Sequence, residues 1–333
     1  MLLGKSAAGG TCRRYRGHRF RRPACHDSRG GPARDAGGAA GRPPALRPGA
    51  GEAHRLAQRA VAGNPGAAAA GLCRASRDRE ADEQEAAHGS SHCQWLHPDL
   101  ILDIGDVEPD YAALADKIQR ETGIPYLLFD GRLAHTPEIL RRLGPLLGEA
   151  AAGGRLADHA EGELKQIEAG LAALPPADRP GVYYARGGTG LQTGPAGSLL
   201  GEIVDMAGGR NLAPPTGSSA PAKTSLAEIA RWDPDVVITQ DAGLYRAMPS
   251  DPGWGALRAV QAHRLYLAPA LPFGWIDEPP GINRLLGLRW LAARLHPQIF
   301  PWDGRAAVRE FCELFYHAKP SDAALDRILA SAP

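Results

Sequence analysis

The order of apolar and polar residues becomes regular from about residue 94 onward. Asp99–Ile104 and Ile124–Phe129 are short apolar runs of the kind found in buried parallel strands. Between them, Tyr111–Thr122 carries apolar residues at helical spacing, and Gly123 is expected to end that helix. The pattern therefore predicts a strand, a helix and a second strand, which is the repeating unit of an open parallel sheet.

Two longer helical segments follow this unit. Pro137–Leu147 is predicted to be helical until Gly148. Ala150–Leu174 has apolar residues at steps of three and four, and a helix of that length would extend roughly 35–40 Å. Such a helix either packs on one body or joins two lobes. The second α/β series that follows it favours the joining role.

The second series predicts a further sheet. Its expected strands and helices are Gly181–Ala185, Gly197–Ala207, Ser225–Arg231, Asp235–Thr239 and Arg264–Leu267. The predicted fold class is α/β, with two lobes that have central, mainly parallel sheets and are joined by a long backbone helix. The predicted divisions are 94–147 for the remaining part of the N-terminal lobe, 148–175 for the linking helix and 176–333 for the C-terminal lobe.

Residues 1–93 have a different composition. They contain no Ile and one Val, and their 16 basic and 8 acidic side chains give +8, which leaves −7 for the rest of the chain. Three hypotheses explain this composition: an arginine-rich arm that binds nucleic acid, a low-complexity tail, or GC-rich DNA translated out of frame. The out-of-frame hypothesis accounts for most of the composition and predicts an incomplete N-terminal lobe. Reading the gene upstream tests it.

Targeting and cysteine patterns add little. The first thirty residues contain no apolar stretch of the length that a signal peptide needs, and no run approaches the eighteen apolar residues of a spanning helix. Cys312 is the one cysteine after residue 94, so an internal disulfide is not expected there.

Four stretches from residue 97 onward carry a family resemblance. In order they are HPDLIL from His97, GSLLGEIVDMAGGRNL from Gly197, SLAEIARWDPDVVI from Ser225, and PFGW from Pro272 with NRLLGLRWL from Asn283. Together they resemble the class III periplasmic substrate-binding proteins of ABC importers, the helical-backbone metal-receptor-like group. The resemblance covers nearly all of 95–333. Family members have further strands and an export signal before this point, and residues 1–93 contain neither.

The resemblance implies an extracytoplasmic solute-binding protein that is not an enzyme and needs no cofactor. Its expected partners are a small-molecule metal chelate, with a ferric siderophore favoured, and the permease of an ABC importer. Nucleic acid is not an expected partner, and the protein is expected to be a monomer. Binding would take place in a cleft between the lobes with a small hinge movement.

Three segments are candidates for the ligand site. The loop after the Gly181 strand could pair with an anionic chelate, or it could be a plain turn. The polar residues after the Asp235 strand lie at a strand end, where ligands gather in open sheets, but they could also form an ordinary surface loop. The aromatic pair in the Pro-rich loop could line the cleft or pack in the core, and the arginine at the next helix could point at the cleft or at solvent. The candidates are Tyr184, Arg186, Gln240, Asp241, Tyr245, Phe273, Trp275 and Arg284.

Glu228 has two possible roles. The resemblance places it where family members present a glutamate to the permease. In Ser225-Leu-Ala-Glu228, however, it also completes a capping box, which satisfies backbone N–H groups at a helix start. The two roles are compatible.

Two other function classes are alternatives. An α/β enzyme would need catalytic motifs, and no G-x-S-x-G elbow, phosphate-binding loop or H-E-x-x-H is present. A carrier of bare metal ions or of molybdate and tungstate is the other alternative. A metal-ion site needs several converging ligands, and the histidines His97, His135, His263, His296 and His317 are scattered along the sequence.

Overall fold

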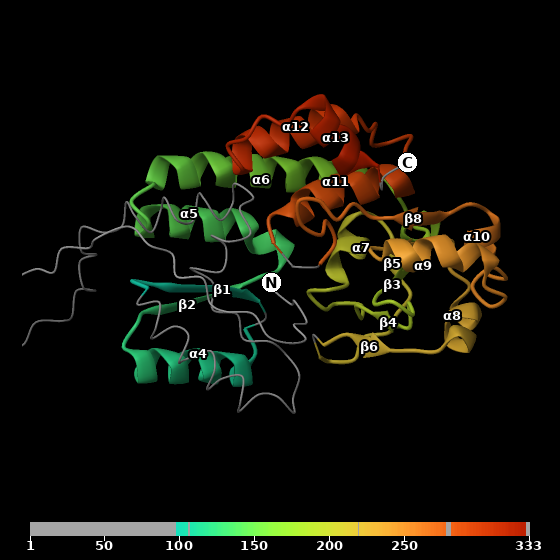
Figure 1. The fold of residues 1–333 in the computed structure, drawn as a ribbon, viewed down its shortest axis with the longest axis horizontal. Helices are drawn as coiled ribbons and strands as arrows, with labels where there is room; N and C mark the ends of the chain where they lie inside the picture. The colour runs from blue at the N-terminus through green and yellow to red at the C-terminus, as the bar shows by residue number, and fades with distance from the viewer. Residues whose placement is uncertain (1–97, 106, 219, 278–280, 331–333) are drawn as a thin grey trace, which may run out of the picture. The chain divides into compact units, whose positions relative to one another are not determined.

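The computed structural model describes residues 98–105, 107–218, 220–277 and 281–330. The hypotheses about residues 1–93 and the candidate ligand His97 lie outside these ranges. Within them, the chain forms two α/β lobes with parallel sheets, as the sequence predicts (Figure 1).

The first lobe contains the predicted strand, helix and strand. β1 (Ile101–Gly105) and β2 (Tyr126–Asp130) pair in parallel over their full length. Between them runs α4 (Pro109–Thr122), which ends at Gly123 in the left-handed region (φ 69°). A residue without a Cβ adopts this conformation at little cost. β1 and β2 lie between α4 on one side and α5 (Thr136–Leu146) on the other (Figure 1).

α6 (Ala150–Leu171) is the predicted long helix, three residues shorter at its C-terminal end. Its 22 residues correspond to roughly 33 Å. It approaches α5 closely where two glycines meet, because a Cβ on Gly144 would lie 2.9 Å from the Cα of Gly153. Farther along, its buried residues Ile167 and Leu171 join the main core with α11 (Asn283–Leu295). The helix therefore packs against elements of both lobes.

The second lobe has a four-stranded sheet in the order β5-β3-β7-β8, with every neighbouring pair parallel. Its strands are β3 (Gly181–Ala185), β5 (Arg210–Asn211), β7 (Val236–Thr239) and β8 (Leu265–Leu267). Every residue of β3 and β7 is buried, which is typical of central strands covered on both faces. A small antiparallel pair, β4 (Gln192–Thr193) with β6 (Ala222–Lys223), stands apart from this sheet.

Short helices connect these strands, and one prediction about them is wrong in extent. The helix expected over Gly197–Ala207 exists only as α7 (Glu202–Met206). Gly197 has φ +76°, and a Cβ on Gly201 would lie 2.3 Å from the carbonyl oxygen of Pro195, so the chain forms tight turns there. The other helices are α8 (Leu226–Trp232), α9 (Ala242–Ala247), α10 (Arg258–Gln261), α12 (Gly304–Phe315) and α13 (Asp322–Leu329).

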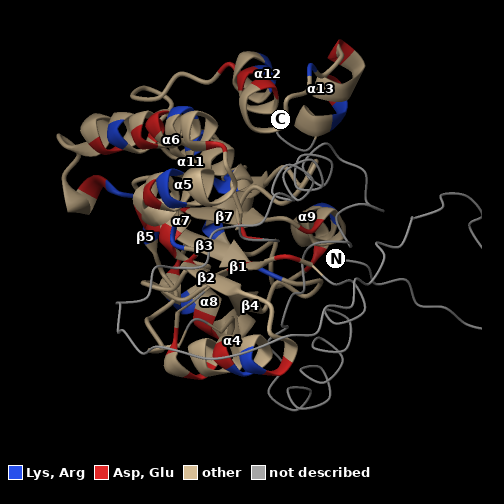
Figure 2. Cartoon of the chain, turned by 90° about the vertical axis from the view of Figure 1, so that its left-hand side faces the viewer, with Lys and Arg blue, Asp and Glu red and all other residues tan. Residues whose placement is uncertain are grey.

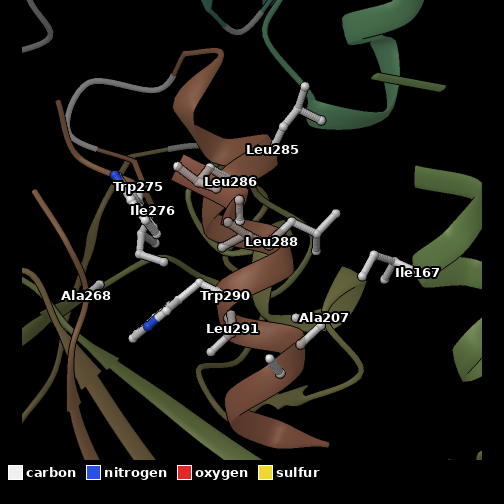
Figure 3. Close-up of a cluster of buried hydrophobic side chains, with 14 of the residues drawn as sticks. Ile167, Ala207, Ala268, Trp275, Ile276, Leu285, Leu286, Leu288, Trp290 and Leu291 are labelled. Atoms are coloured by element: carbon white, nitrogen blue, oxygen red, sulfur yellow. The ribbon is translucent and has the colours of Figure 1, made fainter. Parts of the chain in front are cut away.

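α11 is the centre of the main core. Three of its residues, Leu286, Trp290 and Leu291, are each at most 3% exposed. Figure 3 shows their side chains beside Trp275 and Ile276, which come from the segment before α11. Figure 2 shows the charged residues of both signs on the helices α4, α5 and α6. Burial is thus concentrated around α11 and the strands β3 and β7.

Candidate polar site at the ends of β3 and β7

Four polar side chains meet at the C-terminal ends of β3 and β7. The hydroxyl of Tyr184 donates to Asp277 Oδ1 (2.7 Å), and Nε2 of Gln240 donates to the Tyr184 hydroxyl (3.1 Å) and to Asp277 Oδ1 (3.3 Å). Arg186 Nε lies 2.6 Å from Asp277 Oδ2. β3 and β7 are adjacent and parallel, with Ala185 opposite Thr239, so the residues that follow them share one sheet edge.

Asp277 is the residue that holds this group together. Its side chain is fully buried and the Arg186 side chain is 10% exposed, so the two charges face each other with little water between them. A buried carboxylate needs both a counter-charge and hydrogen-bond donors, and Arg186, Tyr184 and Gln240 supply them. The arrangement fixes the orientation of all three partners.

Backbone contacts determine which way the Gln240 amide points. Oε1 of Gln240 accepts the N–H of Ile276 (2.9 Å), which leaves Nε2 to donate to Tyr184 and Asp277. Ile276 is therefore part of the site through its backbone, although its side chain has no polar atom. Its neighbour Asp277 follows directly in the chain.

The loop after β3 is held by its own contacts. The Tyr183 hydroxyl donates to the Gly190 carbonyl (2.7 Å), and burial raises the pKa of this tyrosine above its ordinary value. Gly187 and Gly190 both have φ near +70°, which favours glycine. The Arg186 N–H donates to the Gln192 carbonyl (2.8 Å). Arg186 thus extends from a restrained turn.

The side chains border a small cavity of about 100 Å³. It is lined by Tyr184, Ala185, Arg186, Gly187, Gln240 and Asp241. The volume corresponds to about three water molecules, so it can take a small anion or one group of a larger ligand. All lining residues belong to the second lobe. A larger open groove of about 640 Å³ lies on α6 and α12, lined by residues that include His159, Arg309 and Glu310.

Asp241 is the N-cap residue of α9, after the strand where the sequence offers either a ligand contact or a surface loop. Its Oδ1 accepts the N–H of Leu244 (2.7 Å), and its own N–H donates to the Thr239 hydroxyl (3.1 Å). It caps α9 and lines the cavity at the same time. Tyr245, one turn into α9, is half-buried against the apolar cluster that contains Leu244.

The remaining candidates lie elsewhere. Phe273 is 39% exposed, whereas Trp275 is fully buried, donates from Nε1 to the Leu271 carbonyl (3.0 Å) and packs its ring 6.4 Å from that of Trp302. This position matches the core-packing alternative for Trp275. Arg284 is 1% exposed and bonded to backbone carbonyls, so in this structure it points neither at the cavity nor at solvent.

Sequence reasoning missed Asp277. The residue lies between the PFGW stretch and two prolines, and neither periodicity nor a known motif marks it. The available signal is a pair of acidic residues, Asp277 and Glu278, in an otherwise apolar, Pro-rich loop, two positions after Trp275. A carboxylate in such surroundings requires a partner, and Arg186 was the candidate arginine.

Glu228 forms the predicted capping box. The Ser225 hydroxyl accepts the Glu228 N–H (3.3 Å), and Glu228 Oε2 accepts the Ser225 N–H (2.9 Å). The Ser225 contacts lower the pKa of the Glu228 carboxyl. The capping role is confirmed, and docking on a permease stays a prediction.

Replacing Ser225 by alanine is expected to lower the free energy of unfolding by about 1 kcal/mol, because the first turn of α8 loses a hydrogen-bond acceptor. Urea unfolding followed by circular dichroism measures the change. Ser218→Ala, on an exposed loop, is the control and should change stability by less than about 0.5 kcal/mol. Equal effects of the two substitutions would contradict the capping role.

Within the described ranges, no three His, Cys, Asp or Glu side chains are grouped closely enough to hold a metal ion. His135 lies 3.2 Å from Asp130, and His296 contacts the Gly208 carbonyl, far from one another in the sequence. Among the described helices, none has the length and apolar character needed to cross a bilayer.

Comparison with known proteins identifies relatives of this fold. A family model described as "Periplasmic binding protein" matches residues 94–271. A search of curated protein sequences found no match. Among solved structures, an ABC transporter solute-binding protein from Sulfurospirillum deleyianum is 28% identical with a TM-score of 0.67, covering 73% of this chain and 75% of that one.

Two further structures are similar. A periplasmic solute-binding protein from Veillonella parvula is 26% identical with a TM-score of 0.57, and covers 72% of this chain and 73% of that one. The molybdate-binding protein MolA of Haemophilus influenzae, solved with molybdate, is 20% identical with a TM-score of 0.58, and covers 70% of this chain and 76% of that one. The MolA match supports the fold alone.

Proposed function

This chain belongs to the periplasmic binding protein family, whose members bind a small solute and work with an ABC transporter permease rather than as enzymes, and we propose that its solute is an anionic metal chelate of the ferric siderophore type. The observation that carries the proposal is the group formed by Tyr184, Arg186, Gln240 and Asp277 beside the cavity. The protein captures the chelate, and the permease receives it.

Arg186 is the proposed contact for the negative charge. A guanidinium group pairs with oxygen anions in a planar, directional way, and this one is placed by a restrained loop and by Asp277. Because the side chain is ordered before binding, little entropy is lost when a ligand arrives. Gln240 and Tyr184 add hydrogen-bonding groups at the same edge of the sheet.

Larger parts of a chelate need apolar surface outside the small cavity. Leu271 and Phe273 are 49% and 39% exposed and precede the segment that carries Asp277. Most ligand sites combine such apolar area with a few fixed polar groups. We propose that Phe273 contacts the organic part of the chelate. We propose that three further candidates support these contacts from the protein interior. They are Tyr245, Trp275 and Arg284.

An oxyanion such as molybdate or tungstate is the second candidate. The observation in its favour is the cavity volume of about 100 Å³, which suits a tetrahedral oxyanion better than an entire chelate. Arg186 would serve either ligand. The two candidates differ in how much of the surface around Phe273 they would cover.

The proposed partner for docking is the permease of an ABC importer, with the protein acting as a monomer. Glu228 is 44% exposed on the first turn of α8. Its Oε2 is engaged in the capping box, while Oε1 lies 4.0 Å from Arg231. We propose that this carboxylate meets a basic group of the permease.

A ligand screen tests the proposal. The full chain is titrated with ferric siderophores, haem, cobalamin, molybdate and tungstate, and tryptophan fluorescence and thermal unfolding are recorded. A ligand at a hundred times its Kd is expected to stabilise the fold by about 2.7 kcal/mol. We expect a ferric siderophore to have the largest effect. An oxyanion as the best ligand would favour the second candidate, and no stabilisation by any compound would contradict both.

Arg186→Ala is expected to weaken binding of the best ligand by about tenfold or more, because a charged hydrogen bond is lost. Arg258→Gln is the control, since Arg258 also bonds to aspartates, Asp233 and Asp235, but on an exposed surface away from the cavity. Binding should be unchanged in this variant. Equal affinity in the two variants would contradict the assignment of Arg186.

A further inference from the structure

Arg284 is a buried arginine that connects segments far apart in the sequence. Its Nε donates to the Ile276 carbonyl (2.9 Å), its Nη2 to the Leu199 carbonyl (2.8 Å), and its Nη1 to the Gly131 carbonyl (3.2 Å). Nη2 also lies 2.8 Å from Glu202 Oε1. With 1% of its surface exposed, the guanidinium group is effectively enclosed by these acceptors.

Glu202 connects Arg284 with the first lobe. Its Oε1 accepts the Leu133 N–H (2.7 Å) in addition to the bond from Arg284. Gly131 follows directly after β2, and Leu133 begins the short 3-10 helix η1 (Leu133–His135), so both lie in the first-lobe segment that leaves this strand. Arg132, between them, donates to the Gly197 carbonyl (3.1 Å). Oε1 of Glu202, a residue of α7, therefore links residues 131–133 to Arg284 of α11.

Ile276 connects Arg284 to the polar site. Its carbonyl accepts from Arg284, while its N–H donates to Gln240, which borders the cavity. The next residue is Asp277, the centre of the site. Displacement of Ile276 would therefore disturb Gln240 through the hydrogen bond and Asp277 through the chain.

We infer that Arg284 and Glu202 are positioning residues: they hold Ile276 and Asp277 in the geometry that the solute site needs, and they join that geometry to residues 131–133 of the first lobe. The effect on solute affinity rests on the proposed function. The effect on Ile276 does not, because it can be measured without a ligand. Neither residue contacts the solute itself.

Amide hydrogen exchange, followed by NMR on the full chain without ligand, measures this role. Glu202→Ala removes the counter-charge of Arg284 and is expected to accelerate exchange of the Ile276 N–H by roughly five- to tenfold, as for the loss of one hydrogen bond. Glu202→Gln keeps a carbonyl oxygen at the same place. It should return the Ile276 exchange rate to within about twofold of the wild type even if the melting temperature falls.

Glu163→Ala is the matched control. Glu163 and Glu202 have the same side-chain exposure, 12%, and each pairs with an arginine of α11, since Glu163 Oε2 lies 3.1 Å from Arg289 Nε. Glu163 lies on α6, and its ion pairs are with Arg289 and His159 rather than with a residue of the site. This variant should lose stability without faster exchange at Ile276. Equal acceleration in the Glu163 and Glu202 variants would overturn the inference.

Arg284→Lys covers the case in which Glu202→Ala does not fold. Lysine keeps the positive charge beside Glu202 but cannot reproduce the planar fork, so the bond to the Ile276 carbonyl should be lost. Faster exchange at Ile276 is expected again, and an unchanged rate would overturn the inference. Once the screen has found a ligand, its Kd should rise about fivefold or more in this variant and stay unchanged in Glu163→Ala. If no ligand is found, the exchange rate of the Ile276 N–H still tests the positioning role of Arg284 and Glu202.

Discussion

Gly287→Ala is expected to lower the free energy of unfolding strongly. Gly287 lies in the middle of α11, and a Cβ there would lie 1.8 Å from the Trp275 carbonyl oxygen and 2.7 Å from its carbonyl carbon. These are backbone atoms of a buried segment, so they cannot turn aside as the end of a side chain would. Overpacking of this kind costs about 1–3 kcal/mol or more, against a total stability of about 5–15 kcal/mol.

Urea unfolding followed by far-UV circular dichroism measures this effect. The control is Gly162→Ala, an exposed glycine on α6 whose added Cβ would meet nothing within 4 Å. Alanine favours a helix over glycine, so this variant should gain up to about 1 kcal/mol. An unfolding midpoint of Gly287→Ala at or above the wild-type value would show that α11 and the Trp275 segment are farther apart than described.

Asp277→Ala is expected to lose both stability and solute binding. It leaves the nearly buried Arg186 without its counter-charge and removes the acceptor of the Tyr184 and Gln240 bonds. Breaking one side of a buried ion pair costs about 3–5 kcal/mol, which is a large part of the stability of a domain. Urea unfolding measures the first effect and fluorescence titration with the best ligand of the screen measures the second.

The double variant Asp277→Ala with Arg186→Ala separates the two effects. Removing both charges eliminates the unpaired guanidinium, so part of the stability should return. Binding should not return, because Arg186, the proposed contact for the solute, is gone. A double variant that binds as tightly as the wild type would contradict the location of the site, whatever its stability.

The sequence predicted the regular elements whose signals are local. β3 is found with its predicted bounds, and β7 differs by one residue, because both are short apolar runs between turn residues. α6 follows from its periodic apolar positions, and α5 from the helical segment that is expected to end at Gly148. The turns over 197–201 were predicted as helix, since the apolar pair Leu199 and Leu200 resembles a helical pattern while the close contact at Gly201 is invisible in sequence.

The same division between local and distant information applies to the site. Tyr184 lies near the end of a predicted strand, and Arg186 and Gln240 follow predicted strands; the structure brings the three together. Asp277 contacts Tyr184 across 93 positions, and Arg284 contacts Gly131 across 153 positions. No pattern along the chain contains such pairs. The sequence therefore indicated the sheet edge of the site but not the residues that close it from the other side.

The peptide groups of Ile276 have a consequence for how the protein can change over time. One of them supplies an N–H to Gln240 and the next supplies a carbonyl to Arg284, so two functions share one short stretch of backbone. Substitutions near the cavity that alter ligand preference will also shift the link between the lobes. A lineage that acquires a new solute is therefore expected to accumulate compensating substitutions around Glu202, far from any atom of that solute.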